Sequence, residues 1–324
     1  MKKRNEKQKE VIAHVVGKTI FAVDQGYSYC KCMTSEKCFK FPTAIAAKKV
    51  AGFEGAREEG LYTFNGRDYR VGDDAVKSDA KKYLRDISFL LDYAPLLVAH
   101  SIILSGLDAI PEILVVGLPL FEHFKYQEEL QKRLALFIVN GITYKFDNVK
   151  VFPQGMGTLA DYITTTNPDS NEDGYVFDVG FNTVISLRYN GLSAQQEGSR
   201  QYDQMGISRP LEELINALKV KHGYNLDLIS LNAAFVSGAI RGDVGGQINI
   251  KELAEPIMAE YLDELINTLK NDFGRYFNQS QRLILSGGGA YYLSELIPSE
   301  YRSKVYVPPM PEFANVRGFF QVGG

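Results

Sequence analysis

Residues that bind metals or form disulfides are scarce in this sequence. Its 324 residues include three cysteines, four histidines and no tryptophan. The cysteines lie close together at positions 30, 32 and 38, but a tetrahedral metal site needs a fourth ligand, and no two histidines stand at ligand spacing. An odd number of cysteines without a signal peptide also argues against a disulfide framework. We therefore expect these cysteines to pack as small apolar residues.

A strong net charge and a long apolar run are also missing. The net charge is −3, so no large field draws the chain to nucleic acid or anionic lipid. No apolar run reaches the length that a membrane-spanning helix needs. Residues 1–17 open with the charged stretch MKKRNEKQKE and lack the features of a signal peptide, so we expect a flexible head. The sequence predicts a cytoplasmic protein without direct contact to nucleic acid or membrane.

The length and the order of segments favour two α/β domains. A chain of 324 residues with 45% hydrophobic and 23% charged residues exceeds one ordinary core. Strands are predicted at 18–23, 29–33 and 37–41, with a hairpin turn at Asn65-Gly66. A polar stretch from Thr164 to Gly174 forms the clearest seam, and a strand with an Asp-x-Gly turn follows it, as at the start of the chain. This weak repeat indicates a duplicated fold with a cleft between its halves.

Several helices are predicted from apolar periodicity and from prolines near helix starts. A buried helix is expected at 94–107 and an amphipathic helix at 124–138. Two further amphipathic helices begin near Pro210 and Pro256. A short closing helix is expected close to the C-terminus.

The stretch VDQGYSYCK ends the first predicted strand in an Asp-x-Gly turn. Asp24, at the carboxyl end of that strand, can hold a hydrated cation through its waters. Gly26 and the following turn expose backbone N–H groups to phosphate oxygens, Ser28 adds a hydroxyl donor, and Lys31 adds a positive charge. Taken alone, this stretch fits a plain hairpin turn better than a binding loop.

The stretch FDVGFNTVI repeats this turn in the second half of the chain. Asp178 and Gly180 form the turn, and Asn182 and Thr183 add further donors. Repetition at the same structural position favours a binding function. Two such hairpins can grip a polyphosphate from both sides while their aspartates share one Mg²⁺.

A third loop, in LILSGGGAYYL, follows a buried strand. Gly287, Gly288 and Gly289 allow close backbone approach to a ligand, and the next helix N-terminus favours anions. The alternative is a tight strand-to-helix turn. The loop lacks both the P-loop lysine and the full dinucleotide fingerprint, so neither of those nucleotide-binding motifs is present.

Together these motifs resemble the actin superfamily of ATPases, and within it the bacterial ParM-type actins that segregate plasmids. The two Asp-x-Gly turns resemble its first and second phosphate loops, and VFPQGMGTLADY resembles the segment before the interdomain helix. LSGGGAYYL is similar to the glycine motif on the adenosine side, and PEFANVRGF to the C-terminal motif of ParM-like proteins. GSRQYDQMGISRP resembles the region beside the base and ribose, with Gly206 as a point of close approach.

The resemblance implies an actin-like ATPase fold, with two duplicated α/β domains around a cleft that binds ATP or ADP and Mg²⁺. Asp24 and Asp178 would orient Mg²⁺ largely through water, and the serine, lysine and threonine of the turns would contact phosphates. Gln154 would position the attacking water, which makes it catalytic together with the two aspartates. The second loop departs from many relatives, which have GGTT followed by an acidic residue. Phe181 narrows this loop, so hydrolysis rate and nucleotide preference stay open.

The resemblance also suggests domain boundaries. Residues 18–165 would form the first domain, with a small subdomain inserted at about 33–95. Residues 174–306 would form the second, with a helical subdomain inserted at about 206–280. Residues 307–324 would return to the first domain.

The function that the resemblance implies is slow ATP hydrolysis coupled to self-assembly into dynamic filaments. The cargo would be plasmid DNA, reached through a separate DNA-binding adaptor protein. One alternative is a scaffold filament that binds nucleotide with little turnover, which the altered second loop leaves open. The other is a small-molecule kinase on the same fold, although no base for a substrate hydroxyl is evident outside the nucleotide site.

Overall fold

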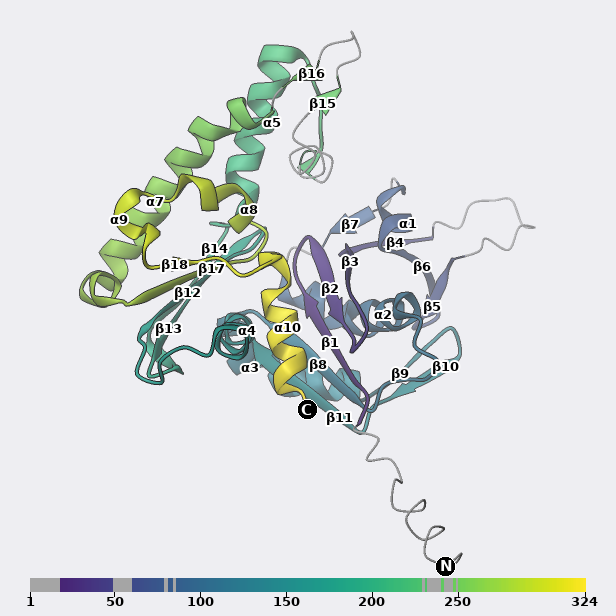
Figure 1. Ribbon diagram of the computed structural model, residues 1–324. Coiled ribbons are helices and arrows are strands. Elements are labelled where there is room, and N and C mark those ends of the chain that lie inside the picture. The colour runs from purple at the N-terminus through teal and green to yellow at the C-terminus, as the bar shows by residue number, and fades with distance from the viewer. Residues whose placement is uncertain are drawn as a thin grey trace, which may run out of the picture.

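Two five-stranded sheets, one from each half of the chain, organise the structure, a computed structural model shown in Figure 1. The described residues are 18–48, 60–78, 81–83, 86–228, 231, 240–241, 247–248 and 250–324. The predicted head and parts of the two predicted subdomains lie outside them. In the described part of the chain, helices cover both faces of each sheet, which confirms the predicted α/β class.

The longer helices lie in layers on the two sheets. They are α2 (Ile87–Ser105), α3 (Leu120–Ala135), α4 (Met156–Thr166), α5 (Ser208–His222), α7 (Ile250–Gln279) and α10 (Ala314–Val322). Short helices are α1 (Asp73–Val76), α8 (Ala290–Leu293), α9 (Ser299–Arg302), η1 (Ser294–Leu296) and η2 (Pro311–Phe313). Helices α2 and α3 cover one face of the first sheet and α10 the other, whereas α5 and α7 cover one face of the second sheet and α4 the other.

The first sheet has the strand order β11-β8-β1-β2-β3. Its strands are β1 (Ile20–Gln25), β2 (Tyr29–Met33), β3 (Cys38–Pro42), β8 (Ile113–Leu118) and β11 (Asn148–Pro153). Strand β1 pairs antiparallel with β2 and parallel with β8. Phe21 and Val23 point to the face covered by α2, while Ala22 points to the face covered by α10. Because both faces are covered, β1 is apolar until Asp24.

The second sheet repeats this plan, with the strand order β14-β13-β12-β17-β18. Its strands are β12 (Gly174–Val179), β13 (Thr183–Asn190), β14 (Ser193–Asp203), β17 (Arg282–Ser286) and β18 (Val305–Tyr306). Strand β12 pairs antiparallel with β13 and parallel with β17, as β1 does with β2 and β8. Each central strand therefore ends in an Asp-x-Gly turn at the same position in its sheet.

Smaller sheets extend from this framework. They are β5-β6-β4-β7, made of β4 (Ala44–Ala47), β5 (Tyr62–Phe64), β6 (Arg67–Val71) and β7 (Lys81–Tyr83), then β9 (Leu136–Val139) with β10 (Ile142–Lys145), and β15 (Ile240–Arg241) with β16 (Gln247–Ile248). The predicted Asn65-Gly66 turn joins β5 to β6. Its two residues have φ values of 50° and 71°, which fits a type I′ hairpin turn and confirms the prediction.

Helix α2 is longer than predicted because it passes through Pro95. Proline has no N–H to donate to the carbonyl of Leu91, and the Arg133 guanidinium donates to that carbonyl instead at 3.2 Å. The helix begins after Asp86, whose carboxylate accepts a 2.8 Å hydrogen bond from the N–H of Phe89. At 19 residues, α2 is long and apolar enough to cross a membrane, so the prediction that no such run exists was wrong. Of its apolar 18-residue window, 61% is buried inside the molecule, where α2 packs on the first sheet.

The helix predicted at 124–138 ends at Ala135, because the next residues form strand β9. Asn140 and Gly141 have φ values of 55° and 74°, and they form a second two-residue hairpin turn between β9 and β10. Phe137 stacks on Tyr144 across this hairpin with ring centroids 5.0 Å apart. The apolar residues at 136–139 thus follow the period of a strand rather than a helix.

Helices α4 and α10 cross at two glycines, close to the centre of the molecule (Figure 1). A Cβ atom on Gly318 would collide with the Gly157 carbonyl, so the backbones can approach only without a side chain there. Next to the crossing, Arg317 donates two hydrogen bonds of 2.9 and 2.7 Å to the buried Asp161 carboxylate. Because α4 leads from the first sheet to the second, this crossing fixes the C-terminal helix to the connection between the halves.

Candidate functional site

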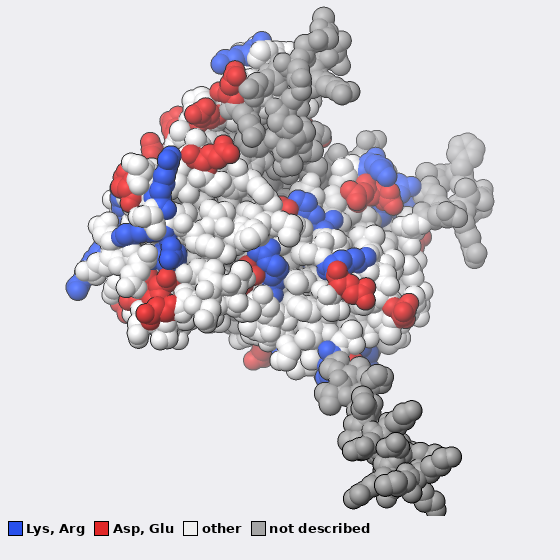
Figure 2. Space-filling view, in the orientation of Figure 1, with Lys and Arg blue, Asp and Glu red and all other residues white. Residues whose placement is uncertain are grey.

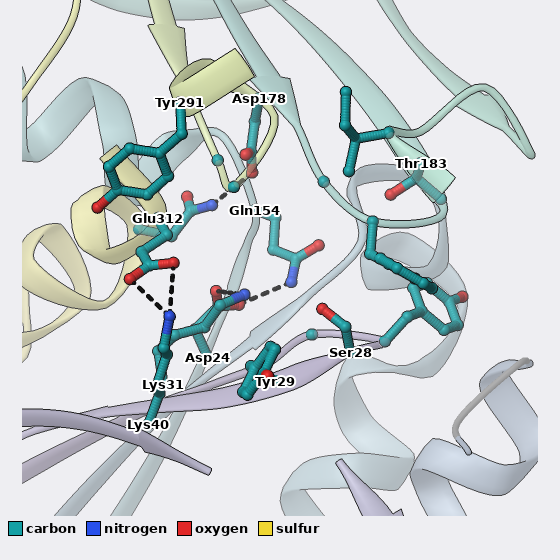
Figure 3. A pocket seen from close by; sticks show the side chains of 18 of the residues that line it. Asp24, Ser28, Tyr29, Lys31, Lys40, Gln154, Asp178, Thr183, Tyr291 and Glu312 are labelled. Carbon is teal, nitrogen blue, oxygen red and sulfur yellow. Dashed lines mark hydrogen bonds and ion pairs between the residues drawn. The ribbon is translucent and has the colours of Figure 1, made fainter. Parts of the chain in front are cut away.

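The two Asp-x-Gly turns, from separate sheets, line one cavity of about 330 Å³ (Figure 3). This volume lies within the range of small-molecule sites. Ten of the residues predicted from sequence line the cavity: Asp24, Gly26, Ser28, Lys31, Gln154, Asp178, Gly180, Thr183, Gly287 and Gly288. The structure therefore brings together three loops that lie far apart in the chain.

The first turn holds a lysine against an aspartate. In the antiparallel pairing of β1 with β2, Asp24 stands opposite Lys31, and Nζ of the lysine lies 3.5 Å from Oδ2 of the aspartate. A Cβ atom on Gly26 would lie only 2.7 Å from that Nζ atom. Gly26 therefore leaves the space in which the ammonium group reaches the carboxylate.

The second turn is held by the N-terminus of α5. The N–H of Gly180 donates to the carbonyl of Thr183 at 2.9 Å, and the N–H of Gly206 donates to the carbonyl of Asn182 at 3.1 Å. A Cβ atom on Gly206 would meet the Phe181 backbone. Asn182 and Gly206 thus lie outside the cavity lining, where they hold the turn, whereas Phe181 lines the cavity.

The glycine loop after β17 lies directly against Asp178. Gly287 has a φ of 81°, and a Cβ atom there would meet Oδ1 of Asp178 and the carbonyl of Val179. Gly289 lies outside the cavity lining and donates a 2.8 Å hydrogen bond to that same carbonyl. A Cβ atom on Gly288 would meet no atom within 4 Å, so this residue faces open space.

Gln154 and Asp24 are joined across the first sheet. Nε2 of Gln154 donates a 2.7 Å hydrogen bond to Oδ1 of Asp24, and both residues are buried. The residue precedes α4, and its backbone N–H donates to the carbonyl of Leu118 at 2.7 Å. The glutamine side chain is therefore fixed beside Asp24 in the lining of the cavity, as Figure 3 shows.

Asn315 holds the other aspartate, and it was not among the predicted site residues. Its Nδ2 donates a 2.6 Å hydrogen bond to Oδ2 of Asp178. Its Oδ1 accepts from the N–H groups of Gly155 and Thr158, at 2.8 and 3.2 Å. The signal in the sequence was the motif PEFANVRGF, which contains Asn315 but does not reveal these contacts.

The cavity carries more negative than positive charge near its floor. Burial and the neighbouring Asp24 together raise the pKa of Asp178 to about 6, although Lys31 and the hydrogen bond from Asn315 oppose this shift. Burial lowers the pKa of Lys31, but Asp24 and Asp178 outweigh this and leave it above its usual value. Two carboxylates facing one ammonium group leave a net negative charge, which a bound cation would balance. In the described residues no three His, Cys, Asp or Glu side chains gather as metal ligands, so such a cation would keep water ligands.

An ion pair lies at one side of the cavity. Nζ of Lys40, on β3, lies 2.9 Å from both carboxylate oxygens of Glu312, on η2, and also over the ring of Tyr29 at 4.9 Å. Figure 3 shows Tyr291 beside this pair. These and other lining residues were missed by sequence reasoning: Tyr27, Tyr29, Lys40, Ile207, Leu228, Tyr291, Tyr292 and Glu312.

A duplicated α/β fold with paired Asp-x-Gly turns around one cavity defines the actin-like class of two-domain proteins. Two family models match the chain: "Actin like proteins N terminal domain" over residues 22–157, and "Archaeal actin homologue MreB-like, C-terminal" over residues 176–298. The chain belongs to the actin superfamily, which confirms the resemblance seen in its motifs. No curated protein gives a significant match.

Solved structures of actin homologues have the same fold. Ta0583, an archaeal actin homologue, is 19% identical with a TM-score of 0.78, over 94% of this chain and 98% of that one. The same protein in complex with ADP gives 19% identity and a TM-score of 0.77, over 93% and 98% of the two chains. A 15-stranded ParM filament from Clostridium botulinum is 22% identical with a TM-score of 0.72, over 94% and 99%.

Proposed function

We propose that this protein binds ATP with Mg²⁺ between its two Asp-x-Gly turns, hydrolyses it slowly, and assembles into dynamic filaments that segregate plasmid DNA. The observation that carries this proposal is the meeting of Asp24 and Asp178, from separate sheets, in one cavity with Lys31. A polyphosphate with its cation matches this pattern of two carboxylates, one ammonium group and exposed turn backbone.

The residues of the cavity fit both groups. Gly288 lines the cavity and faces open space, so a phosphate can approach the backbone of the glycine loop there. Asp24 and Asp178 would hold Mg²⁺ through water, and Lys31, Ser28 and Thr183 would contact phosphate. When bound, Mg²⁺ neutralises phosphate charge.

Gln154 is placed to orient the attacking water. Its Nε2 is engaged by Asp24, so its carbonyl oxygen stays available to accept a hydrogen bond from water. A neutral amide orients water without removing a proton, which suits a reaction that depends on positioning and electrostatics. We therefore expect slow turnover.

Self-assembly is supported by the family. One related structure is a ParM filament, and another, at 22% identity, is described as a non-polymerisable ParM mutant. We extend filament formation to this chain, in the cytoplasm, with a DNA-binding adaptor between filament and plasmid. On the face shown in Figure 2, acidic and basic side chains of the described residues are interspersed, which favours an adaptor over direct DNA contact.

The test is sedimentation of the purified protein with Mg²⁺–ATP, Mg²⁺–ADP or no nucleotide, with released phosphate followed in the same sample. Nucleotide-dependent pelleting with phosphate release supports a dynamic filament, and Asp178→Ala should then abolish the release. Pelleting without release would indicate the scaffold filament. Absence of assembly over a wide protein concentration range would overturn the filament proposal and favour the kinase.

A further inference from the structure

We propose that Asn315 is a positioning residue that sets the Asp178 carboxylate and couples cation binding to the packing of α4 on α10. This inference rests on the proposed function, because it concerns the cation that accompanies the nucleotide. Asn315 is 5% exposed and stands at the start of α10. Its amide gives one hydrogen bond to Asp178 and accepts two from the start of α4.

The start of α4 is a common anchor for both aspartates. Gln154 reaches Asp24 directly through its side chain. Gly155, the next residue, reaches Asp178 through Asn315, because its N–H donates to the oxygen of the same amide whose nitrogen donates to the carboxylate. One short segment between the sheets therefore orients the two carboxylates, each through a carboxamide.

The position of Asn315 depends on the crossing of α4 and α10. The backbones touch at Gly157 and Gly318, and Arg317 is paired with Asp161 in two hydrogen bonds. Any relative shift of the two helices would change the distances from Asn315 to the start of α4. The Asp178 carboxylate would then turn, since its Oδ2 is held by Asn315 and its Oδ1 lies against Gly287.

The test measures how strongly magnesium enhances ADP affinity. ADP dissociation constants are determined by calorimetry with magnesium chloride and with EDTA, and their ratio is the magnesium effect. We expect Asn315→Ala to lower this ratio about tenfold while the affinity in EDTA changes less than about threefold. The readout is an equilibrium constant, so it does not depend on turnover.

Two comparisons separate positioning from a general packing role. Ser101→Ala removes a buried 2.7 Å hydrogen bond to the Val98 carbonyl within α2, away from Asn315 and the cavity lining, and should leave the magnesium effect unchanged. In a protein that already carries Asp178→Asn, Asn315→Ala should reduce the magnesium effect by less than a further factor of about two. A positioning residue acts only through its partner, and here the partner has been changed.

A second variant is needed in case Asn315→Ala does not fold, which a cooperative unfolding transition would reveal. Asn315→Asp retains the oxygen that accepts from Gly155 and Thr158 but replaces the donor to Asp178 with a carboxylate oxygen, so it should change the magnesium effect by at least about threefold. An unchanged effect in both Asn315 variants, or an equal loss in Ser101→Ala, overturns the inference alone. A wild-type protein that does not bind ADP overturns the proposed function, and this inference with it.

Discussion

Oδ1 of Asp24 accepts a 2.7 Å hydrogen bond from the side chain of Gln154, a residue 130 positions further along the chain. The aspartate ends the central strand of the first sheet, and the glutamine stands at the start of α4. Because a carboxylate only accepts hydrogen bonds, the amide nitrogen must face Asp24 and the amide oxygen must face away from it. The oxygen is thus free to bind water in the cavity.

Gln154→Ala should therefore slow hydrolysis more than it weakens binding. We expect phosphate release to fall by roughly ten- to a hundredfold, because positioning of the water is lost, while ADP affinity changes less than about threefold. Gln131→Ala is a matched control, since Gln131 donates its amide to the Val149 carbonyl away from the cavity. Equal release rates for Gln154→Ala and the wild type would refute this role.

Neighbouring glycines should respond differently to the same substitution. Gly287→Ala places a methyl group against Asp178 at a φ of 81°, and we expect a loss of roughly 1–3 kcal/mol in unfolding free energy together with weaker nucleotide binding. Gly288→Ala meets no atom within 4 Å and should change stability by less than about 0.5 kcal/mol. Urea unfolding and ADP titration measure both effects. Similar stability of the two variants would show that the loop is not constrained as described.

The ion pair between Lys40 and Glu312 should slow nucleotide release. Glu312 stands beside Pro311, whose carbonyl accepts a 3.0 Å hydrogen bond from Gly287, so the pair links β3 to the glycine loop. Glu312→Gln should speed ADP dissociation by about two- to tenfold, and the exchanged pair Lys40→Glu with Glu312→Lys should recover part of the difference.

Stopped-flow release of a fluorescent ADP measures this effect. Lys132→Met serves as control, because Lys132 forms an exposed pair with Glu128 on α3. If Glu312→Gln leaves the ADP release rate unchanged, the ion pair does not slow nucleotide release.

Acid should destabilise the fold through His100. Burial lowers the pKa of His100 to about 4, and its Nδ1 lies 2.7 Å from the hydroxyl of Tyr62. Since the folded pKa is below the unfolded value of about 6.5, this stability is fully present above pH 6.5 and is lost as the pH falls towards 4. The loss should reach about 2–3 kcal/mol at pH 4.5.

Unfolding free energies of the wild type and of His100→Gln, measured from pH 7.5 to 4.5, test this prediction. The glutamine variant lacks the titrating group, so its stability should fall less steeply with acid. Parallel curves would mean that His100 is not buried in its neutral form.

The central strands and their turns could be predicted because local chemistry determines them. Strands β1 and β12 are apolar runs that end in Asp-x-Gly. One such turn alone fits a plain hairpin, but the same turn in both halves of the chain indicates a function. Asn65-Gly66 was predictable for the same reason, since both residues favour positive φ. The repetition of the first turn around Asp178 then located both sides of the cavity.

Tertiary contacts explain what the sequence did not reveal. The helix predicted at 94–107 begins earlier, because Arg133 satisfies the carbonyl that Pro95 leaves free and the helix continues through this proline. Asn315 lies 160 positions from Gly155, and the geometry that joins them arises only when α10 crosses α4. The ion pair between Lys40 and Glu312 could not be predicted from the sequence, because only the fold places η2 beside β3.

The most direct test is an equilibrium titration of ATP, with magnesium chloride, into the wild type and into Asp24→Ala and Asp178→Ala. If the two turns form one site, the wild type binds a single ATP and either substitution alone weakens binding at least about tenfold. Wild-type affinity in either variant, or no binding by the wild type, would contradict the claim that the turns face each other across one nucleotide.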